Sequence, residues 1–375
     1  MQATNNMKEE KKVEAPQAAA PVVSPFQQLF DEGYQVIEEP VLTADECKQL
    51  VSEWWDWAES LNSGIDRNDP TAGKWPANIH GIIQYPSAAH IIPVWRARTH
   101  PKVVAKFAEL WGVKPEDLLV SFDRMNVQRP SSRNKPQKGW LHIDQGARIA
   151  NSRCYQGLIP LIDMPQEAGT LVVMPGSHKL HKELFQRFPD EVKKSKDNWL
   201  RFNEDKLKWL EEEHKLKTVR TSAKAGQLVL WDSRTAHQGS YALPGVQRDH
   251  WRMVVYVCMK PKPKPRNNGK DRINLEKAMA KKRKVFLEGR TTSHWPGPEP
   301  LAKRTKTGNT QLSWQPIKCF PDKPRTWGKE DALIEEPPTA IKVRTTADLR
   351  AIGGDLALSL AGFPITTPTN PPPLE

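Results

Sequence analysis

Two metal-binding side chains stand one residue apart in the segment WLHIDQG, at His142 and Asp144. Successive side chains of a β-strand point to opposite faces, so a strand here would bring both side chains to the same face. An imidazole and a carboxylate in this arrangement are two of the three ligands of the 2-His-1-carboxylate triad that binds non-haem Fe(II). A His-x-Asp sequence also occurs by chance and as a structural hydrogen bond, so the hypothesis requires a second histidine.

A second histidine follows another apolar segment far along the chain. In GQLVLWDSRTAHQGS the strand-like residues 228–231 lead into a short turn, and His237 stands at the end of that turn. In RDHWRMVVYVCM, Arg252 opens an alternating segment in which it shares a face with Val254 and Tyr256. A guanidinium in this place can hold a carboxylate through two hydrogen bonds, as iron enzymes that use 2-oxoglutarate require. The order His-x-Asp, His, Arg therefore indicates an iron site of this kind.

These segments resemble the phytanoyl-CoA dioxygenase family of Fe(II)/2-oxoglutarate-dependent oxygenases. The matching sequences are FDEGYQVIEEPVLTADEC, HPKVVAKFAELWG, WLHIDQG, EAGTLVVMPGSHK and AGQLVLWDSRTAHQGS, and GTLVVMPGSH is a particularly specific match. The resemblance covers residues 25–259. It implies a double-stranded β-helix, which is a jelly roll with the iron at its mouth, and it implies His142, Asp144 and His237 as the metal ligands.

The resemblance also implies an arginine, shortly after the distal histidine, that binds the co-substrate 2-oxoglutarate. Both Arg248 and Arg252 lie in that interval. We prefer Arg252 because it begins a strand and faces inward, whereas Arg248 stands in the loop segment GVQRD, where a solvated arginine is the alternative. Ser240, in the turn after His237, and Gln156, on its strand, are further candidates for hydrogen bonds to 2-oxoglutarate. Ordinary turn and strand contacts are the alternative for both.

The activity that the resemblance implies is a 2-oxoglutarate-dependent hydroxylation. O2 and 2-oxoglutarate are consumed, succinate and CO2 are released, and a C–H bond of a small or cofactor-linked organic substrate is hydroxylated. The protein supplies orientation and a dry pocket. Asp144 bears on the outcome, because relatives that halogenate lack this carboxylate and leave room for a halide. Its presence favours hydroxylation, or an oxidation derived from it.

The elements expected to position these residues are mainly β-strands, behind an N-terminal layer of helices. A strand is expected at residues 34–37, a helix after the capping box of Thr43 and Glu46, and a second helix over residues 100–112. Short β-rich segments separated by Gly, Pro, Asn and Ser follow, interrupted by a charged, helical insert at residues 179–215. Because no helix separates successive strands, this pattern favours a jelly roll, or cupin-like core, over parallel βαβ units.

The positive charge of the chain is concentrated in one region. The 375 residues carry a formal net charge of +12, which alone would suggest an anionic partner such as nucleic acid. Residues 260–330 hold 19 Lys and Arg against 6 Asp and Glu, so the rest of the chain is nearly neutral. We therefore expect a disordered leader at residues 1–24, an oxygenase domain at residues 25–261, and a basic, Pro-rich, partly disordered extension at residues 262–375.

The basic extension leaves two further hypotheses open. The cluster Lys281-Lys282-Arg283-Lys284 resembles a nuclear localisation signal, and residues 262–330 could dock a nucleic acid; a solvated helix face is the alternative. An oxygenase that modifies a nucleic acid or a protein would show salt-sensitive binding that deletion of residues 262–330 removes. A non-catalytic jelly-roll binding module is the other hypothesis, and the complete set of metal- and carboxylate-binding residues argues against it.

The remaining patterns concern the compartment. No segment approaches the roughly 18–20 apolar residues of a transmembrane helix. The N-terminus has no apolar secretory core, and the four cysteines form no CxxC pair. A reducing, intracellular compartment is expected: cytoplasmic, or nuclear if the basic cluster acts as a signal. The sequence leaves the prime substrate and the oligomeric state open.

Overall fold

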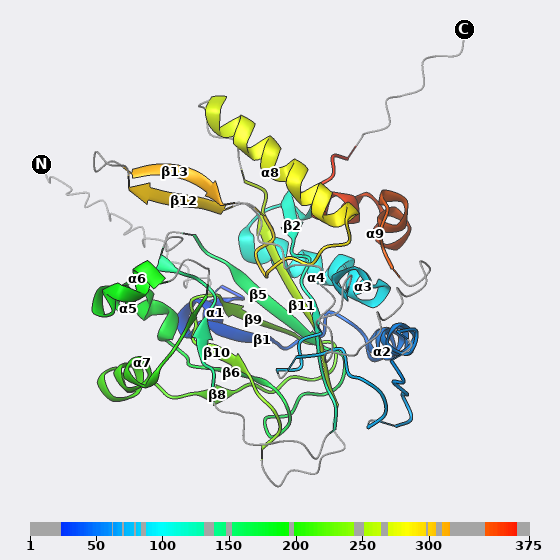
Figure 1. The fold of residues 1–375 in the computed structure, drawn as a ribbon, viewed down its shortest axis with the longest axis horizontal. Coiled ribbons are helices and arrows are strands. Elements are labelled where there is room, and N and C mark those ends of the chain that lie inside the picture. Colours follow the sequence, from blue (N-terminus) through cyan, green and yellow to red (C-terminus); the bar gives the residue numbers. More distant parts are fainter. Residues whose placement is uncertain are drawn as a thin grey trace, which may run out of the picture.

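The architecture is known from a computed structural model (Figure 1). The structure describes residues 24–61, 63–69, 71–78, 80–83, 88–130, 139–147, 152–194, 199–243, 251–263, 269–297, 299–304, 310–315 and 342–365. Its helices are α1 (Gln27–Glu32), α2 (Ala44–Glu59), α3 (Ile92–Thr99), α4 (Pro101–Trp111), α5 (His181–Arg187), α6 (Pro189–Lys194), α7 (Glu204–Lys208), α8 (Gly269–Leu287) and α9 (Thr346–Leu360). Its strands are β1 (Tyr34–Ile37), β2 (Leu118–Val120), β3 (Met125–Gln128), β4 (His142–Ile143), β5 (Tyr155–Pro160), β6 (Leu171–Val173), β7 (Leu200–Arg201), β8 (Val219–Arg220), β9 (Leu228–Asp232), β10 (His237–Gly239), β11 (Arg252–Pro261), β12 (Glu299–Arg304) and β13 (Thr310–Gln315).

Two antiparallel sheets form the centre of this mixed α/β fold. The first has the strand order β1-β9-β5-β11-β2, with β3 also paired to β11. The second has the order β7-β4-β10-β6-β8, and a separate hairpin joins β12 to β13. Every pairing between these strands is antiparallel, which agrees with the expected absence of parallel βαβ units.

Side chains of β11 alternate between two hydrophobic cores. Met253 and Val255 belong to the core beneath the helices, whereas Val254 and Tyr256 belong to the core that the first sheet shares with β6 of the second. Arg252 has the same parity as Val254 and Tyr256 and therefore lies on the face toward the second sheet. This is the face predicted from the alternation in the sequence.

A layer of helices covers the outer face of the first sheet. As expected, α2 begins at a capping box in which the Thr43 hydroxyl accepts from the Glu46 amide and the Glu46 carboxylate accepts from the Thr43 amide. Helix α4 ends at Gly112, whose φ of 61° is the left-handed conformation that terminates many helices. Figure 1 shows α2, α3 and α4 together on one side of the sheets, with α9 beside α3.

The charged insert covers the outer face of the second sheet. Leu184 and Phe185 of α5, together with Trp209 and Leu210 after α7, form one core with Ile143 of β4. The insert is helical as predicted, but it also contains the short strand β7, which pairs with β4 and which the charged sequence did not indicate. Among the described residues, no helix is long and apolar enough to cross a membrane.

The chain after β11 packs against the same hydrophobic core as the N-terminal helices. Val285 and Phe286 of α8 and Leu349 and Leu358 of α9 are buried in the core beneath the helices. Helix α9 is kinked at its glycine pair, where the φ of Gly354 is 61°.

One basic residue of α8 is a structural group. Lys282 is fully buried, and its Nζ donates 2.6 Å hydrogen bonds to the main-chain carbonyls of Val120 and Pro296. The same ammonium lies 3.9 Å from the centroid of the Phe122 ring. The interpretation of the basic cluster as a solvated helix face is therefore wrong for Lys282, because this side chain joins α8 to β2.

We predict that replacing Lys282 by Met, which has a similar volume, lowers the free energy of unfolding by about 2–3 kcal/mol, because two buried carbonyls lose their donor. Urea denaturation followed by circular dichroism measures the change. Lys284→Met is the matched control, since this side chain is 74% exposed and forms only a 3.7 Å ion pair with Glu288. Equal stability of the two variants would contradict the assignment of Lys282 as a structural group.

Candidate metal centre

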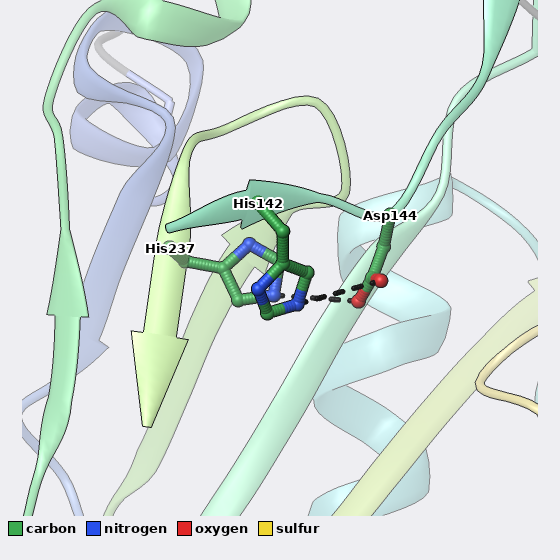
Figure 2. Close-up of side chains that lie close together, drawn as sticks. All are labelled: His142, Asp144 and His237. Atoms are coloured by element: carbon green, nitrogen blue, oxygen red, sulfur yellow. Dashed lines mark ion pairs between the residues drawn. The ribbon is translucent and has the colours of Figure 1, made fainter. Parts of the chain in front are cut away.

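His142 and His237 lie directly opposite each other on β4 and β10, which are neighbours in the second sheet. Their ring centroids are 4.3 Å apart, and each residue is about 95% buried, with 5% and 4% exposure. Figure 2 shows both imidazoles directed into the same space, with the Asp144 carboxylate facing them. The antiparallel register therefore joins two histidines that are distant in the sequence.

Main-chain hydrogen bonds set the orientation of both rings. The Nδ1 atom of His142 lies 3.1 Å from the carbonyl of Trp140, and Nδ1 of His237 lies 2.8 Å from the carbonyl of Thr235. A carbonyl oxygen can only accept, so in each ring Nδ1 carries the proton and donates. The unprotonated Nε2 atoms then face the shared space, which is the tautomer that a metal ion requires.

Asp144 completes the cluster from the residue just after β4. The strand ends at Ile143, and the Asp144 amide donates to the carbonyl of Ser233 at 2.8 Å. The carboxylate oxygens lie 3.6 Å from Nε2 of His142 and 3.3 Å from Nε2 of His237. One donor atom from each of the three residues lies within 4.8 Å of the other two.

The electrostatic environment favours the metal-binding protonation states of His142 and Asp144. Burial lowers the pKa of His142 to about 3, and the neighbouring His237 adds to the effect, so His142 is neutral at pH 7. Burial acts to raise the pKa of Asp144, but the surrounding imidazoles of His294, His142 and His237 hold it well below its usual range. Two imidazoles whose Nδ1 atoms donate to the main chain, beside one carboxylate, fit an Fe(II) site of the facial-triad type.

A cavity of about 250 Å³ opens onto the three residues. Its aromatic wall contains Trp140, Trp199, Trp231 and Tyr256. Trp140 is held between two imidazoles, with ring centroids 4.0 Å from His80 and 4.5 Å from His142. Its indole N–H donates to the carbonyl of Gly239 at 2.9 Å, which ties this wall to β10.

The two other candidates with described positions are Gln156 and Ser240, and both are buried. The Gln156 amide donates to Oδ2 of Asp144 at 3.0 Å, so in this structure it orients the carboxylate. The Ser240 hydroxyl donates to the carbonyl of Thr170 at 3.3 Å, which is an ordinary turn contact. Arg248 lies outside the described residues.

Arg252 is a buried cation without a hydrogen-bond partner in the described part of the chain. It is 4% exposed, and none of its three guanidinium nitrogens forms a hydrogen bond of good geometry, although the Tyr256 hydroxyl is close enough to interact with it. A Cβ atom at Gly169 would lie 3.1 Å from Cδ of Arg252 and 3.3 Å from the carbonyl oxygen of Ser240, so the missing side chain lets these residues approach. Burial raises the pKa of the nearby Tyr256 hydroxyl, and the Arg252 charge acts against that rise. A guanidinium left unpaired in this way is suited to an anionic ligand.

Two polar residues of the cavity wall, Asp123 and His294, were not singled out from the sequence. Nδ1 of His294 lies 3.7 Å from Oδ2 of Asp144. In the sequence, the one hint near His294 is the neighbouring pair Trp295-Pro296, because an aromatic residue in a basic segment indicates that the segment packs against the protein. Asp123 follows a buried strand, and nothing in its spacing marks it as part of a site.

Comparison with known proteins adds independent findings. The sequence pattern of the family described as phytanoyl-CoA dioxygenase (PhyH) matches residues 30–242. A relative from Aspergillus versicolor, "Ava biosynthesis cluster protein O", is 30% identical over 277 residues, which cover 71% of this chain and 83% of the relative.

The solved structures to which this chain is similar include the non-heme alpha ketoglutarate dependent carbocyclase SnoK from nogalamycin biosynthesis. It has a TM-score of 0.43 and 18% identity, and the match covers 66% of this chain and 88% of SnoK. The Ni complex of the non-heme monooxygenase ThoJ has a TM-score of 0.38 and 18% identity, with 64% of this chain and 77% of ThoJ covered.

We predict that Gln156→Leu weakens binding of a divalent metal by about 10- to 100-fold, because the Asp144 carboxylate loses the amide that orients it. Anaerobic titration with Fe(II), or titration with Co(II) followed by its visible absorption, measures the change in Kd. Gln166→Leu is the control, because its side chain is exposed. An unchanged Kd in Gln156→Leu would show that the contact does not support the carboxylate.

Proposed function

The chain belongs to the phytanoyl-CoA dioxygenase family of Fe(II)- and 2-oxoglutarate-dependent oxygenases, and we propose that it hydroxylates a C–H bond of a small organic substrate. The observation that carries this proposal is the cluster of His142, Asp144 and His237, in which hydrogen bonds to the main chain turn both Nε2 atoms toward the carboxylate. We assign these three residues as the iron ligands.

Bound iron, with 2-oxoglutarate and O2, supplies the oxidising chemistry: one oxygen atom enters succinate as CO2 is lost, and the other enters the substrate as a hydroxyl group. The residues of the chain position the reactants and exclude water. His142, Asp144 and His237 would hold the metal, and they line the cavity that would receive the other reactants. Gln156 keeps the carboxylate in place.

Arg252 is assigned to the distal carboxylate of 2-oxoglutarate. The support is its burial, its three unpartnered nitrogens and its position on the strand face that carries Tyr256, a residue of the cavity wall. A bidentate ion pair with this carboxylate would replace the hydrogen bonds to water that the guanidinium nitrogens of Arg252 lose on burial. The main-chain carbonyl of Ser240 and Cδ of Arg252 both lie close to Gly169, and the Ser240 hydroxyl is assigned a secondary contact that would replace its bond to Thr170.

We extend the proposal to the finer architecture and to the substrate class. The two antiparallel sheets, which share a core containing β6, are proposed to be the two halves of a double-stranded β-helix. Residues 25–261 would form the oxygenase domain. A relative named for a biosynthesis cluster supports a small-molecule substrate over a macromolecular one.

The proposal predicts that anaerobic addition of Fe(II) and 2-oxoglutarate to the protein gives the visible charge-transfer band of the metal-bound keto acid. His142→Ala and Asp144→Ala should each abolish the band, because each removes a ligand. His214→Ala is a control, since His214 lies outside the cavity and pairs with Glu183. A wild-type protein with neither the band nor succinate formation in air would refute the proposed function.

The assignment of the co-substrate arginine predicts that Arg252→Leu raises the Kd of 2-oxoglutarate at least about tenfold, because a buried charged hydrogen bond is lost. At saturating 2-oxoglutarate the band should return, since the metal ligands are intact. Arg248→Leu and the exposed Arg350→Leu should change the Kd little. A large effect in Arg248→Leu with none in Arg252→Leu would transfer the role to Arg248.

A further inference from the structure

Trp199 is a large apolar side chain that the fold leaves uncovered beside the metal cluster. It is 45% exposed, and it is one of the residues that line the cavity. The centroid of its ring lies 5.7 Å from that of the His142 imidazole. Exposed aromatic surface is unfavourable in water, so a molecule in the cavity that covers this indole gains free energy of binding.

The place of Trp199 is set by β7, the strand that follows it. Leu200 of β7 pairs with Ile143 of β4, and both side chains lie in the core formed with the insert helices. Because successive side chains of a strand point to opposite faces, Trp199 is turned to the other face of the sheet, which is the face of His142. The contact between the two rings agrees with this direction. The second sheet therefore positions the uncovered indole.

The other aromatic residues of the wall already have protein neighbours. Trp231 of β9 and Tyr256 of β11 line the cavity from the first sheet, and Trp231 is only 2% exposed. Trp140 is half-buried and stacked against the His142 imidazole. Trp199 is the most exposed of the three indoles in the described wall, so it offers the largest ring surface to a bound molecule.

The side chains of the wall favour an uncharged molecule over one that carries phosphates. The described residues that line the cavity include neither Lys nor Arg, the two side chains that proteins use most for binding phosphate groups. Ile82 and Leu171 add apolar surface to the aromatic residues. The cavity volume of about 250 Å³ is on the scale of a small ring system, which fits an apolar molecule of this size.

We propose that Trp199 determines the specificity of the cavity, and that the prime substrate is an uncharged molecule whose aromatic ring stacks on the Trp199 indole. This inference rests on the proposed function, in which His142 is a metal ligand. Stacking holds one face of the substrate against the indole and so orients its C–H bonds relative to the metal cluster. A saturated ring of the same skeleton loses this interaction, because aromatic pairs contribute free energy beyond the area that they bury.

The test compares probes that share one carbon skeleton, on the protein loaded anaerobically with Fe(II) and excess 2-oxoglutarate. They are 2-naphthol, its saturated analogue decahydro-2-naphthol, and the anion 2-naphthalenesulfonate, and calorimetry measures each Kd. We expect 2-naphthol to bind at least about threefold more tightly than decahydro-2-naphthol, which hydrophobicity alone would not produce. The sulfonate should bind more weakly than 2-naphthol, and excess 2-oxoglutarate keeps it from Arg252.

Variants then locate the preference for the aromatic probe. Trp199→Leu keeps an apolar side chain and should bring the ratio of the two Kd values close to one, whereas Trp199→Phe should retain the preference. Phe30→Leu is the matched control, because Phe30 is 37% exposed on α1 and does not line the cavity. Equal or weaker binding of 2-naphthol in the wild type, an unchanged ratio in Trp199→Leu, tighter binding of the sulfonate, or no binding of either neutral probe would overturn the inference.

The charge-transfer band of each sample separates this inference from the proposed function. Trp199→Leu should keep the band, because the three metal ligands are intact. A wild-type protein without the band and without succinate formation would refute the proposed function. The ratio of the two neutral probes on that same protein would still test stacking on Trp199.

Discussion

The metal centre depends on one pairing, the antiparallel register that sets His237 of β10 opposite His142 of β4. Because side chains alternate along a strand, a slip of one residue would turn either imidazole to the other face of the sheet. The residues on both sides of His142, Leu141 and Ile143, are buried in the core formed with the insert helices. That apolar packing on the outer face fixes the register and keeps the imidazole directed inward.

Local patterns were sufficient to predict most elements around this pairing. The alternation in β11 placed Arg252 and Tyr256 on one face, and the capping box at Thr43 marked the start of α2 because both signals act over a few neighbouring residues. The spacing in WLHIDQG and the position of His237 nominated the cluster that the structure brings together.

What could not be predicted depends on contacts between distant segments. Nothing in the composition of α8 distinguishes Lys282 from Lys281 or Lys284, because the difference is the presence of the Val120 and Pro296 carbonyls in the folded chain. For the same reason the sequence could not mark His294 as a cavity residue, since the atoms that it contacts belong to Asp144, far from it in the chain. Removing residues 262–330 to test nucleic-acid docking would also remove this part of the cavity wall.

Ser293 and His294, which line the cavity, follow α8 and are therefore synthesised after the residues of the metal cluster. The three residues of the metal cluster precede α8 in the chain, and proteins fold from the N-terminus as they are synthesised. A nascent chain that has just completed β11 already contains His142, Asp144 and His237, but it lacks Ser293 and His294 of the cavity wall. The wall around the cluster is therefore completed only by the part of the chain that is synthesised last.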